Sequence, residues 1–114
     1  MYKELGQLKT DTKFNSVGKE KMLKTNLADF EAWNPQARLF SLVQVKPGEE
    51  VDYHMHMGES ETFFILSGQG VYNDNGNKVD VKPGMVTFTP SGQGHSIKNT
   101  GEEILAFIAL IVVD

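Results

Sequence analysis

A chain of 114 residues with 15 acidic and 11 basic side chains has the length of one domain and a formal charge of -4. No basic cluster interleaves with aromatic residues, so the charge pattern of a nucleic-acid-binding protein is missing. Because the chain contains no cysteine, disulfides, thiolate metal sites and thiol catalysis are excluded.

The first 36 residues are polar and loosely patterned, and we interpret residues 1–36 as an N-terminal arm that pairs with the rest of the chain or with a partner subunit. The stretches in it that could form a short strand or a helical turn are KMLKT and LADFEAW. The start, MYKELGQLKTDTK, is charged and has no apolar run of the signal-peptide type, which predicts a cytoplasmic address. The longest apolar run, ILAFIALIVV, is about half as long as the roughly 20 residues of a membrane span, so no membrane partner is expected.

From Arg38 onward, short runs rich in Val, Ile, Phe and Thr alternate with Gly, Pro and Asn, a spacing typical of an all-β sandwich or barrel. The predicted strands are RLFSLVQV, VDYHMH, TFFIL, QGVYN, NKVDV, MVTFTP, HSIKN and EILAFIALIVV. The last run, EILAFIALIVV, lacks the alternation of apolar and polar residues that is typical of a strand with one solvent-exposed face. Both of its faces should therefore be covered, either by the N-terminal arm or by a second subunit.

The segments between these runs have turn chemistry. Residues 73–77, NDNGN, tolerate positive φ and predict a tight hairpin. The sequence VKPG precedes a strand twice, at residues 45–48 and 81–84. Pro presets φ at the second position and Gly tolerates positive φ at the third, as a type II turn requires. The repeat indicates either two unrelated turns or two equivalent corners of a pseudo-symmetric barrel.

Two of the three histidines, His54 and His56, are one residue apart in the predicted strand VDYHMH. Because side chains alternate along a strand, both project from one face and can converge on one ion. Such a pair alone is weak evidence, since it is more often solvated or hydrogen-bonded. Glu61 begins the next strand and His95 follows a glycine-rich turn, so one metal site could use every histidine of the chain.

Two further carboxylates lie near this pair in the sequence. Asp52 has the parity of His54 and His56 and should face the same side. It could be an acid–base group, a partner that fixes a histidine tautomer, or a solvated carboxylate. Glu59 is a rival of Glu61 as a ligand, although it falls in the predicted loop.

The surroundings of the predicted site leave alternatives open. Phe63 and Ile65 share the parity of Glu61, so they either line an apolar pocket wall or belong to the core. Arg38 either reaches an anionic substrate or is a surface arginine.

Two spaced patterns connect these residues. The first is Gly, five residues, His-x-His, four residues, Glu, six residues and Gly, and it contains Gly48, His54, His56, Glu61 and Gly68. The second is Gly, five residues, Pro-x-Gly, two residues, His, three residues and Asn, and it contains Gly84, Pro90, Gly92, His95 and Asn99. All of these positions match the two motifs of the cupin superfamily. The chain from Arg38 to Val113 resembles a small single-domain cupin.

The resemblance implies a cupin jelly-roll β-barrel over residues 37–114, a double-sheet antiparallel architecture. It also implies that the mouth of the barrel holds a metal ion on four ligands, His54, His56, Glu61 and His95. Asn99 is then expected to tie down a loop, with contact to a substrate as the alternative. Small cupins are commonly homodimers, so a homodimer is expected.

Three neutral imidazoles and one carboxylate leave a divalent ion with a charge near +1, and the candidates are Mn, Fe, Co, Ni, Zn and Cu. If the ion is octahedral, two positions remain for water or for a bidentate anion such as a carboxylate, a hydroxy acid or an enediolate. The ion would act as a Lewis acid, and a redox-active metal could also bring oxygen and substrate together.

We therefore expect a protein with one divalent metal ion that acts on a small oxygen-rich metabolite, a carboxylate, hydroxy acid or sugar. As an enzyme it would be an isomerase, a decarboxylase or a dioxygenase. The alternative is a non-catalytic binding or sensing module that uses the metal to capture its ligand. A purely structural ion would not require four convergent ligands with open positions. The lack of an obvious general base beyond Asp52 mildly favours binding or metal-only catalysis.

Overall fold

The computed structural model describes residues 1–114 as ten β-strands and one short 3₁₀ helix, η1 (Leu5–Gln7). The first strands are β1 (Thr10–Phe14), β2 (Glu20–Asn26), β3 (Ala37–Val45), β4 (Glu50–Met55) and β5 (Glu59–Ser67). The remaining strands are β6 (Gly70–Asp74), β7 (Asn77–Val81), β8 (Val86–Thr89), β9 (Gly94–Asn99) and β10 (Leu105–Val113). The predicted all-β fold is confirmed. No helix has the length and hydropathy that a membrane crossing needs.

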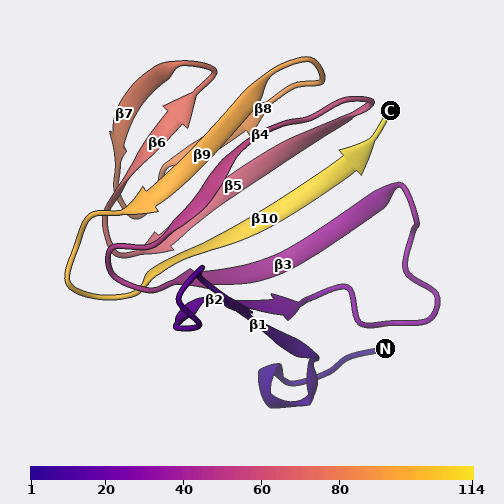
Figure 1. Cartoon of the computed structure of the whole chain (residues 1–114). Coiled ribbons are helices and arrows are strands. Elements are labelled where there is room, and N and C mark those ends of the chain that lie inside the picture. The colour runs from indigo at the N-terminus through magenta and orange to yellow at the C-terminus, as the bar shows by residue number, and fades with distance from the viewer.

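The strands form two antiparallel sheets that face each other as the two layers of a jelly roll (Figure 1). The first sheet has six strands in the order β1-β2-β3-β10-β5-β8, and the second has four in the order β4-β9-β6-β7. Strand β10 lies inside the larger sheet, between β3 and β5. Residues 1–36 contribute η1, β1 and β2, and β2 pairs with β3, so the larger sheet continues into the N-terminal strands.

The predicted turns form as their residues require. In the first VKPG turn, the carbonyl oxygen of Lys46 accepts a hydrogen bond from the backbone N–H of Glu49, and Gly48 has a φ of 79°. In the second, the carbonyl oxygen of Lys82 accepts one from the backbone N–H of Met85, and Gly84 has a φ of 91°. Both VKPG repeats therefore have the positive-φ glycine of a type II turn. In the hairpin between β6 and β7, Asn75 and Gly76 occupy the two positive-φ positions.

The hydrophobic core fills the space between the two sheets. It is a cluster of 11 buried side chains: Met22, Val43, Val45, Phe63, Ile65, Tyr72, Val81, Ile97, Leu105, Phe107 and Ala109. Each large aliphatic or aromatic member contributes roughly 1.5–3 kcal/mol by its burial. Alternation in β3, β5 and β10 directs these side chains inward. The core ends below the histidines, which occupy the open end of the layers.

Two β-bulges lie beside this open end. Opposite β10, Leu39 pairs with Ile111 and Ala37 with Val112, so Arg38 has no partner. In β4, Val51 pairs with Ile97 of β9 while His54 pairs with His95, so the two residues between Val51 and His54 face one on β9. An extra residue locally changes the direction in which side chains point. Both bulges therefore affect which side chains reach the cavity between the sheets.

Candidate metal centre

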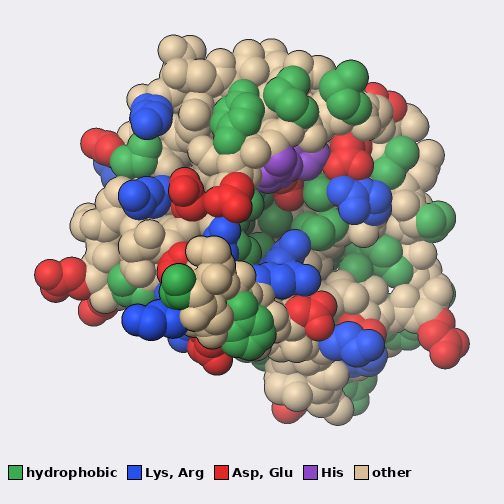
Figure 2. All heavy atoms as spheres, in the orientation of Figure 1, with side chains coloured by type: hydrophobic (Ala, Val, Ile, Leu, Met, Phe, Trp, Pro, Cys, Tyr) green, Lys and Arg blue, Asp and Glu red, His purple; other side chains and the backbone are tan.

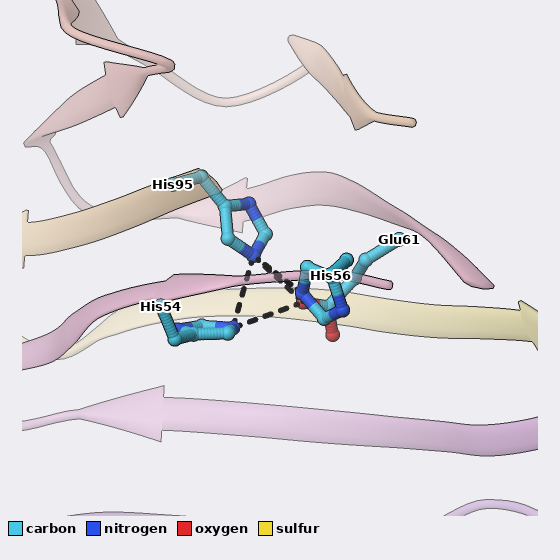
Figure 3. A group of neighbouring side chains, drawn as sticks. All are labelled: His54, His56, Glu61 and His95. Carbon is cyan, nitrogen blue, oxygen red and sulfur yellow. Dashed lines mark hydrogen bonds and ion pairs between the residues drawn. The ribbon is translucent and has the colours of Figure 1, made fainter. Parts of the chain in front are cut away.

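The four ligands that the sequence motifs predict come together at one point (Figure 3). Nε2 of His95 lies 3.0 Å from Nε2 of His56 and 3.2 Å from Nε2 of His54. Oε1 of Glu61 lies 2.9 Å from Nε2 of His95, 3.0 Å from that of His56 and 3.8 Å from that of His54. All four donor atoms lie within 4.8 Å of one another.

The two sheets supply these ligands jointly. His54 and His95 are Cα partners on β4 and β9 in the four-stranded sheet. His56 follows β4, and its backbone donates to Gln93 at 3.0 Å and accepts from Gly92 at 2.7 Å. The proline-glycine turn before β9 therefore positions His56 as well as His95. Glu61 reaches the group from β5 in the six-stranded sheet.

Each histidine uses its other ring nitrogen in a hydrogen bond to an oxygen. Nδ1 of His54 lies 2.7 Å from the carbonyl oxygen of Asp52, and Nδ1 of His56 lies 2.9 Å from Oε2 of Glu59. These two acceptors require Nδ1–H donors, which leaves the Nε2 lone pairs of the neutral rings directed at the common point. Such outer hydrogen bonds fix the tautomer and orientation of a metal-binding histidine.

His95 is surrounded by two hydroxyl groups. Its Nδ1 lies 2.8 Å from the Tyr72 hydroxyl and 2.9 Å from Oγ1 of Thr89, and the two hydroxyls lie 2.7 Å apart. A neutral His95 can donate from Nδ1 to either oxygen while Nε2 points at the other ligands. The ring of Phe63 stacks on His95 at a centroid distance of 5.0 Å and so fixes its plane.

The donor set fits one divalent cation. Lone pairs about 3 Å apart repel each other unless a proton or a cation lies between them. Donors held by one ion at about 2.0–2.2 Å lie roughly 3 Å apart when the bond angle is near 90°. The separations of 2.9, 3.0 and 3.2 Å agree with this value. The cluster therefore has the chemistry and the spacing of a metal site.

The electrostatics of Glu61 agree with a ligand that stays ionised. Burial raises the pKa of Glu61, but hydrogen bonding to His54 and His95 outweighs it and lowers the pKa to about 2. The same contact with Glu61 raises the pKa of His54 above its usual range, although burial opposes the rise. The carboxylate is thus charged at all ordinary pH values, and its negative charge favours a proton or a cation on His54.

A cavity of about 250 Å³ adjoins these ligands. His54, His56 and Glu61 lie on its wall, together with the cationic side chains of Lys24 and Arg38. The rest of its lining is hydrophobic: Met22, Leu39, Val43, Val51, Phe63, Phe107, Ala109 and Ile111. In Figure 2, histidines border a hollow on this face of the molecule, with Lys and Arg side chains on the opposite border.

The family model described as Cupin domain matches residues 41–113, and the match includes all four ligands. The chain is a cupin. The "Oxalate-binding protein" of Thermotoga maritima is 45% identical to this cupin over 96 residues, which are 84% of this chain and 79% of that protein.

Solved structures resemble the cupin over nearly its whole length. One, described as a predicted oxalate decarboxylase from Thermotoga maritima, is 39% identical with a TM-score of 0.90 and covers 100% of both chains. Another is the cupin domain of Schizosaccharomyces pombe Cnp3, with 21% identity, a TM-score of 0.77, and coverage of 97% of this chain and 72% of that one. At 21% identity the second likeness concerns the fold alone.

The structure separates the three residues predicted for a substrate pocket. Phe63 lines the cavity of the cupin. Ile65 is fully buried in the core and does not line the cavity. Asn99 donates to the carbonyl oxygens of Val45 and Glu103 and so ties down the loop after β9.

The parity of Asp52 predicted that its carboxylate would lie beside the histidines, and this prediction is wrong. It is 76% exposed and pairs with Lys21 at 3.1 Å. The bulge in β4 breaks the alternation on which that prediction depended. Asp52 contributes its carbonyl oxygen instead, as the acceptor for His54.

Glu59 is not one of the four converging residues; it forms a hydrogen bond with the ring nitrogen of His56 that faces away from them. Its Oε2 accepts from Nδ1 of His56, while both of its oxygens accept from Arg38 at 2.8 and 3.0 Å. This bidentate pair raises the pKa of Arg38 and lowers that of Glu59. Arg38 therefore supports the ligand group through Glu59 and also lines the cavity.

Sequence reasoning missed most of the apolar cavity lining, and it missed the contribution of β2, which supplies Met22 and Lys24. The only signal for them was their shared parity in the stretch KMLKT, which was interpreted as part of an arm without a site. That parity places both on one face of a strand. It does not reveal that β2 pairs with β3 beside the cavity, which is a long-range contact.

Proposed function

We propose that the protein holds one divalent metal ion on His54, His56, Glu61 and His95 and binds a small carboxylate, with oxalate as the leading candidate, in the adjoining cavity. The observation that carries this proposal is the composition of the cavity. Its wall combines the ligand group with two cationic side chains, Lys24 and Arg38, and is otherwise apolar. Such a site favours a small anion over a neutral or cationic molecule.

The residues of the chain have distinct parts in this proposal. A bound ion supplies a Lewis acid that attracts carboxylate oxygens. Lys24 and Arg38 attract the anion, and Phe63 with its apolar neighbours limits the water that competes for it. The volume of about 250 Å³ lies below the roughly 300–1,000 Å³ of sites for drug-sized ligands, which supports a ligand of few atoms.

The relatives support oxalate as the first ligand to test. A Thermotoga maritima protein is named for oxalate binding, and a solved structure from that organism is described as a predicted oxalate decarboxylase. The two descriptions differ in activity but share the ligand. The named protein is 45% identical to this chain over 96 residues, and the solved chain is 39% identical to it.

Binding is favoured over turnover by what the cavity wall lacks. Apart from the ligands, its titratable side chains are Lys24 and Arg38. Asp52 points to solvent, and Glu59 is occupied by Arg38 and His56. No free carboxylate is therefore available as a general acid or base. The catalytic alternatives, an isomerase, a decarboxylase or a dioxygenase, would have to rely on Lys24 or on the bound metal instead of a carboxylate.

The test begins with the metal content of protein purified without an affinity tag or chelator, measured by plasma mass spectrometry. We expect about one ion per chain. Isothermal titration with oxalate should then give a binding isotherm for the metal-loaded protein and none after chelation. An isotherm that persists without metal contradicts the proposal. Assays for formate and carbon dioxide on the same samples separate binding from decarboxylation.

We also propose that two copies of the chain associate through the outer face of the six-stranded sheet. Five apolar residues on this face are 41–64% exposed: Phe64, Leu66, Val86, Phe88 and Val112. A continuous exposed apolar face of this kind is typical of an interaction site. The outward positions of β5, β8 and β10 carry no charged side chain, so two copies of net charge -4 can meet here without direct repulsion.

The association is tested with Phe88→Glu, which places a charge on the apolar face at β8, where Phe88 is 58% exposed. Sedimentation velocity should show a dimer for the unaltered protein and a monomer for this variant. Val79→Glu is the matched control, because Val79 is 45% exposed on β7 of the other sheet. It should remain dimeric. A monomeric unaltered protein would exclude the dimer.

A further inference from the structure

Lys24 differs from the other lysines in its combination of burial and missing partners. Three lysines are partly buried: Lys21, Lys24 and Lys46. Lys21 pairs with Asp52 at 3.1 Å and Lys46 with Glu20 at 3.6 Å. Lys24 forms neither an ion pair nor a side-chain hydrogen bond, and the remaining lysines are exposed. A partly buried ammonium group without an acceptor is a costly arrangement unless an anion from outside completes it.

The surroundings of Lys24 indicate where such an anion would lie. Lys24 lines the cavity beside the metal ligands and also a shallower groove of about 220 Å³ that continues across β1, β2 and β3. Arg38 and Leu39 are shared by both spaces. Lys24 therefore stands at the boundary between the metal end of the site and a second compartment.

The second compartment is itself polar, and three of its four charged side chains are cationic. Its lining consists of Asp11, Lys13, Lys24, Asn26, Arg38, Leu39 and Ser41. Burial is the main cause that lowers the pKa of Lys24, and the charge of Lys13 adds to it, while Glu61 and Asp11, the cross-strand partner of Lys24, act in the opposite direction. Lys24 thus interacts electrostatically both with the groove and with the metal ligands. An anionic group beside it would relieve the repulsion from Lys13 and Arg38.

We propose that Lys24 forms a second anion subsite, so that the ligand of the cavity is a dicarboxylate with one carboxylate beside the four metal ligands and the other paired with Lys24. This inference rests on the proposed function and specifies its ligand class. The charges agree with it. A divalent ion and Glu61 leave one positive charge, Lys24 adds a second, and Arg38 is already balanced by Glu59. A ligand with two negative charges neutralises the site, whereas a monocarboxylate leaves Lys24 unpaired.

The groove sets the permitted size of this ligand. Because it continues past Lys24 along β1 and β2, the second carboxylate is not confined to the spacing of oxalate. Three- and four-carbon diacids should therefore also fit. The N-terminal strands acquire a function here, since without β2 the cavity would lose both Lys24 and Met22.

The experiment compares each diacid with a monoamide of nearly the same shape and one charge fewer. The probes are oxalate with oxamate and succinate with succinamate, titrated calorimetrically into protein loaded with the metal ion that copurifies. The unaltered protein should prefer the diacid of at least one pair by roughly tenfold to a hundredfold, the value of a charge-assisted hydrogen bond. Lys24→Gln should remove this preference at unchanged metal content, and Lys24→Arg should restore most of it.

Lys46→Gln is the matched control. It removes the same charge from a partly buried lysine that does not line the cavity, so its diacid preference should equal that of the unaltered protein. If the unaltered protein binds diacids and monoamides equally, or if Lys24→Gln keeps the preference, the assignment of Lys24 is overturned and the proposed function survives. If the metal-loaded protein binds none of the four probes, the proposed function fails as well.

Discussion

His54 on β4 and His95 on β9 are direct cross-strand partners, although 41 residues separate them in the sequence. Their Nε2 atoms lie 3.2 Å apart, yet the side chain of His54 is 40% exposed and that of His95 is fully buried. His95 also contacts Tyr72, Thr89 and Phe63 from the core side. The two residues are therefore equivalent in the predicted ligand group but unequal in their burial.

Substituting either histidine should separate these two roles. His54→Ala and His95→Ala should each lose most of the bound metal, measured as ions per chain. In metal-free protein, His54→Ala should change the free energy of unfolding by less than about 1 kcal/mol, as an exposed substitution does. His95→Ala should lower it by roughly 1–3 kcal/mol, because buried hydroxyls lose a partner. Full metal occupancy in both variants would refute the assigned site.

Removing Glu59 should weaken the metal site although Glu59 does not belong to the ligand group. Glu59→Ala leaves Nδ1 of His56 without its acceptor and Arg38 without its partner. The loss of an outer hydrogen bond typically costs about 10- to 100-fold in metal affinity. Competition with a fluorescent chelator measures this change. Glu50→Ala removes a carboxylate on β4 that forms no side-chain hydrogen bond or ion pair, so this variant should bind metal as the unaltered protein does.

The two hydroxyls beside His95 should be redundant. Either Tyr72 or Thr89 can accept from Nδ1 of His95, so Tyr72→Phe and Thr89→Val should each reduce metal affinity only a few-fold. The double variant leaves no acceptor, and its loss should exceed the product of the two single losses. Metal titrations of the four proteins form a double-mutant cycle that measures this coupling. Simple additivity would show that only one hydroxyl fixes the ring.

Metal affinity should fall as the pH falls, and the imidazoles should cause the fall. The contact with Glu61 raises the pKa of His54 in the metal-free protein, so this ring gains a proton at or above the usual value of about 6.5 as the pH decreases. A protonated ring cannot bind metal, and affinity therefore declines through this range. Glu61, with a pKa of about 2, remains ionised throughout. Metal content that stays constant from pH 8 to about pH 4.5 would contradict this mechanism.

The ligand group could be predicted from the sequence because its residues occupy fixed intervals in two short motifs. Strand alternation directs His54 and Glu61 inward, and the turn before His95 fixes its register. The same alternation failed at Asp52, where a bulge turns the carboxylate to solvent. This bulge depends on how β4 pairs with β9, and the sequence of β4 alone does not indicate that pairing.

The N-terminal strands were harder to predict than the jelly roll itself. Strand β1 reads TDTKF, which contains a single large apolar side chain and has almost no hydrophobic pattern. It forms because its backbone pairs with the edge of β2, and the hydroxyls of Thr10 and Thr25 are hydrogen-bonded at 2.9 Å. The contribution of Lys24 to the cavity follows from that tertiary pairing. Residue spacing alone cannot show that an ammonium group on β2 lies near histidines on β4.

The predicted ligands come from both sheets, so a bound metal ion would stabilise the packing of one sheet against the other. His54 and His95 belong to the four-stranded layer, His56 is hydrogen-bonded to the turn before β9, and Glu61 belongs to the six-stranded layer. An ion bound to all four would therefore join the two layers. Thermodynamic linkage then ties folding to the metal supply, with about 2.7 kcal/mol of added stability at a free ion concentration one hundred times the Kd. If the ion binds as proposed, the melting temperature of this protein would rise with the free metal concentration around it.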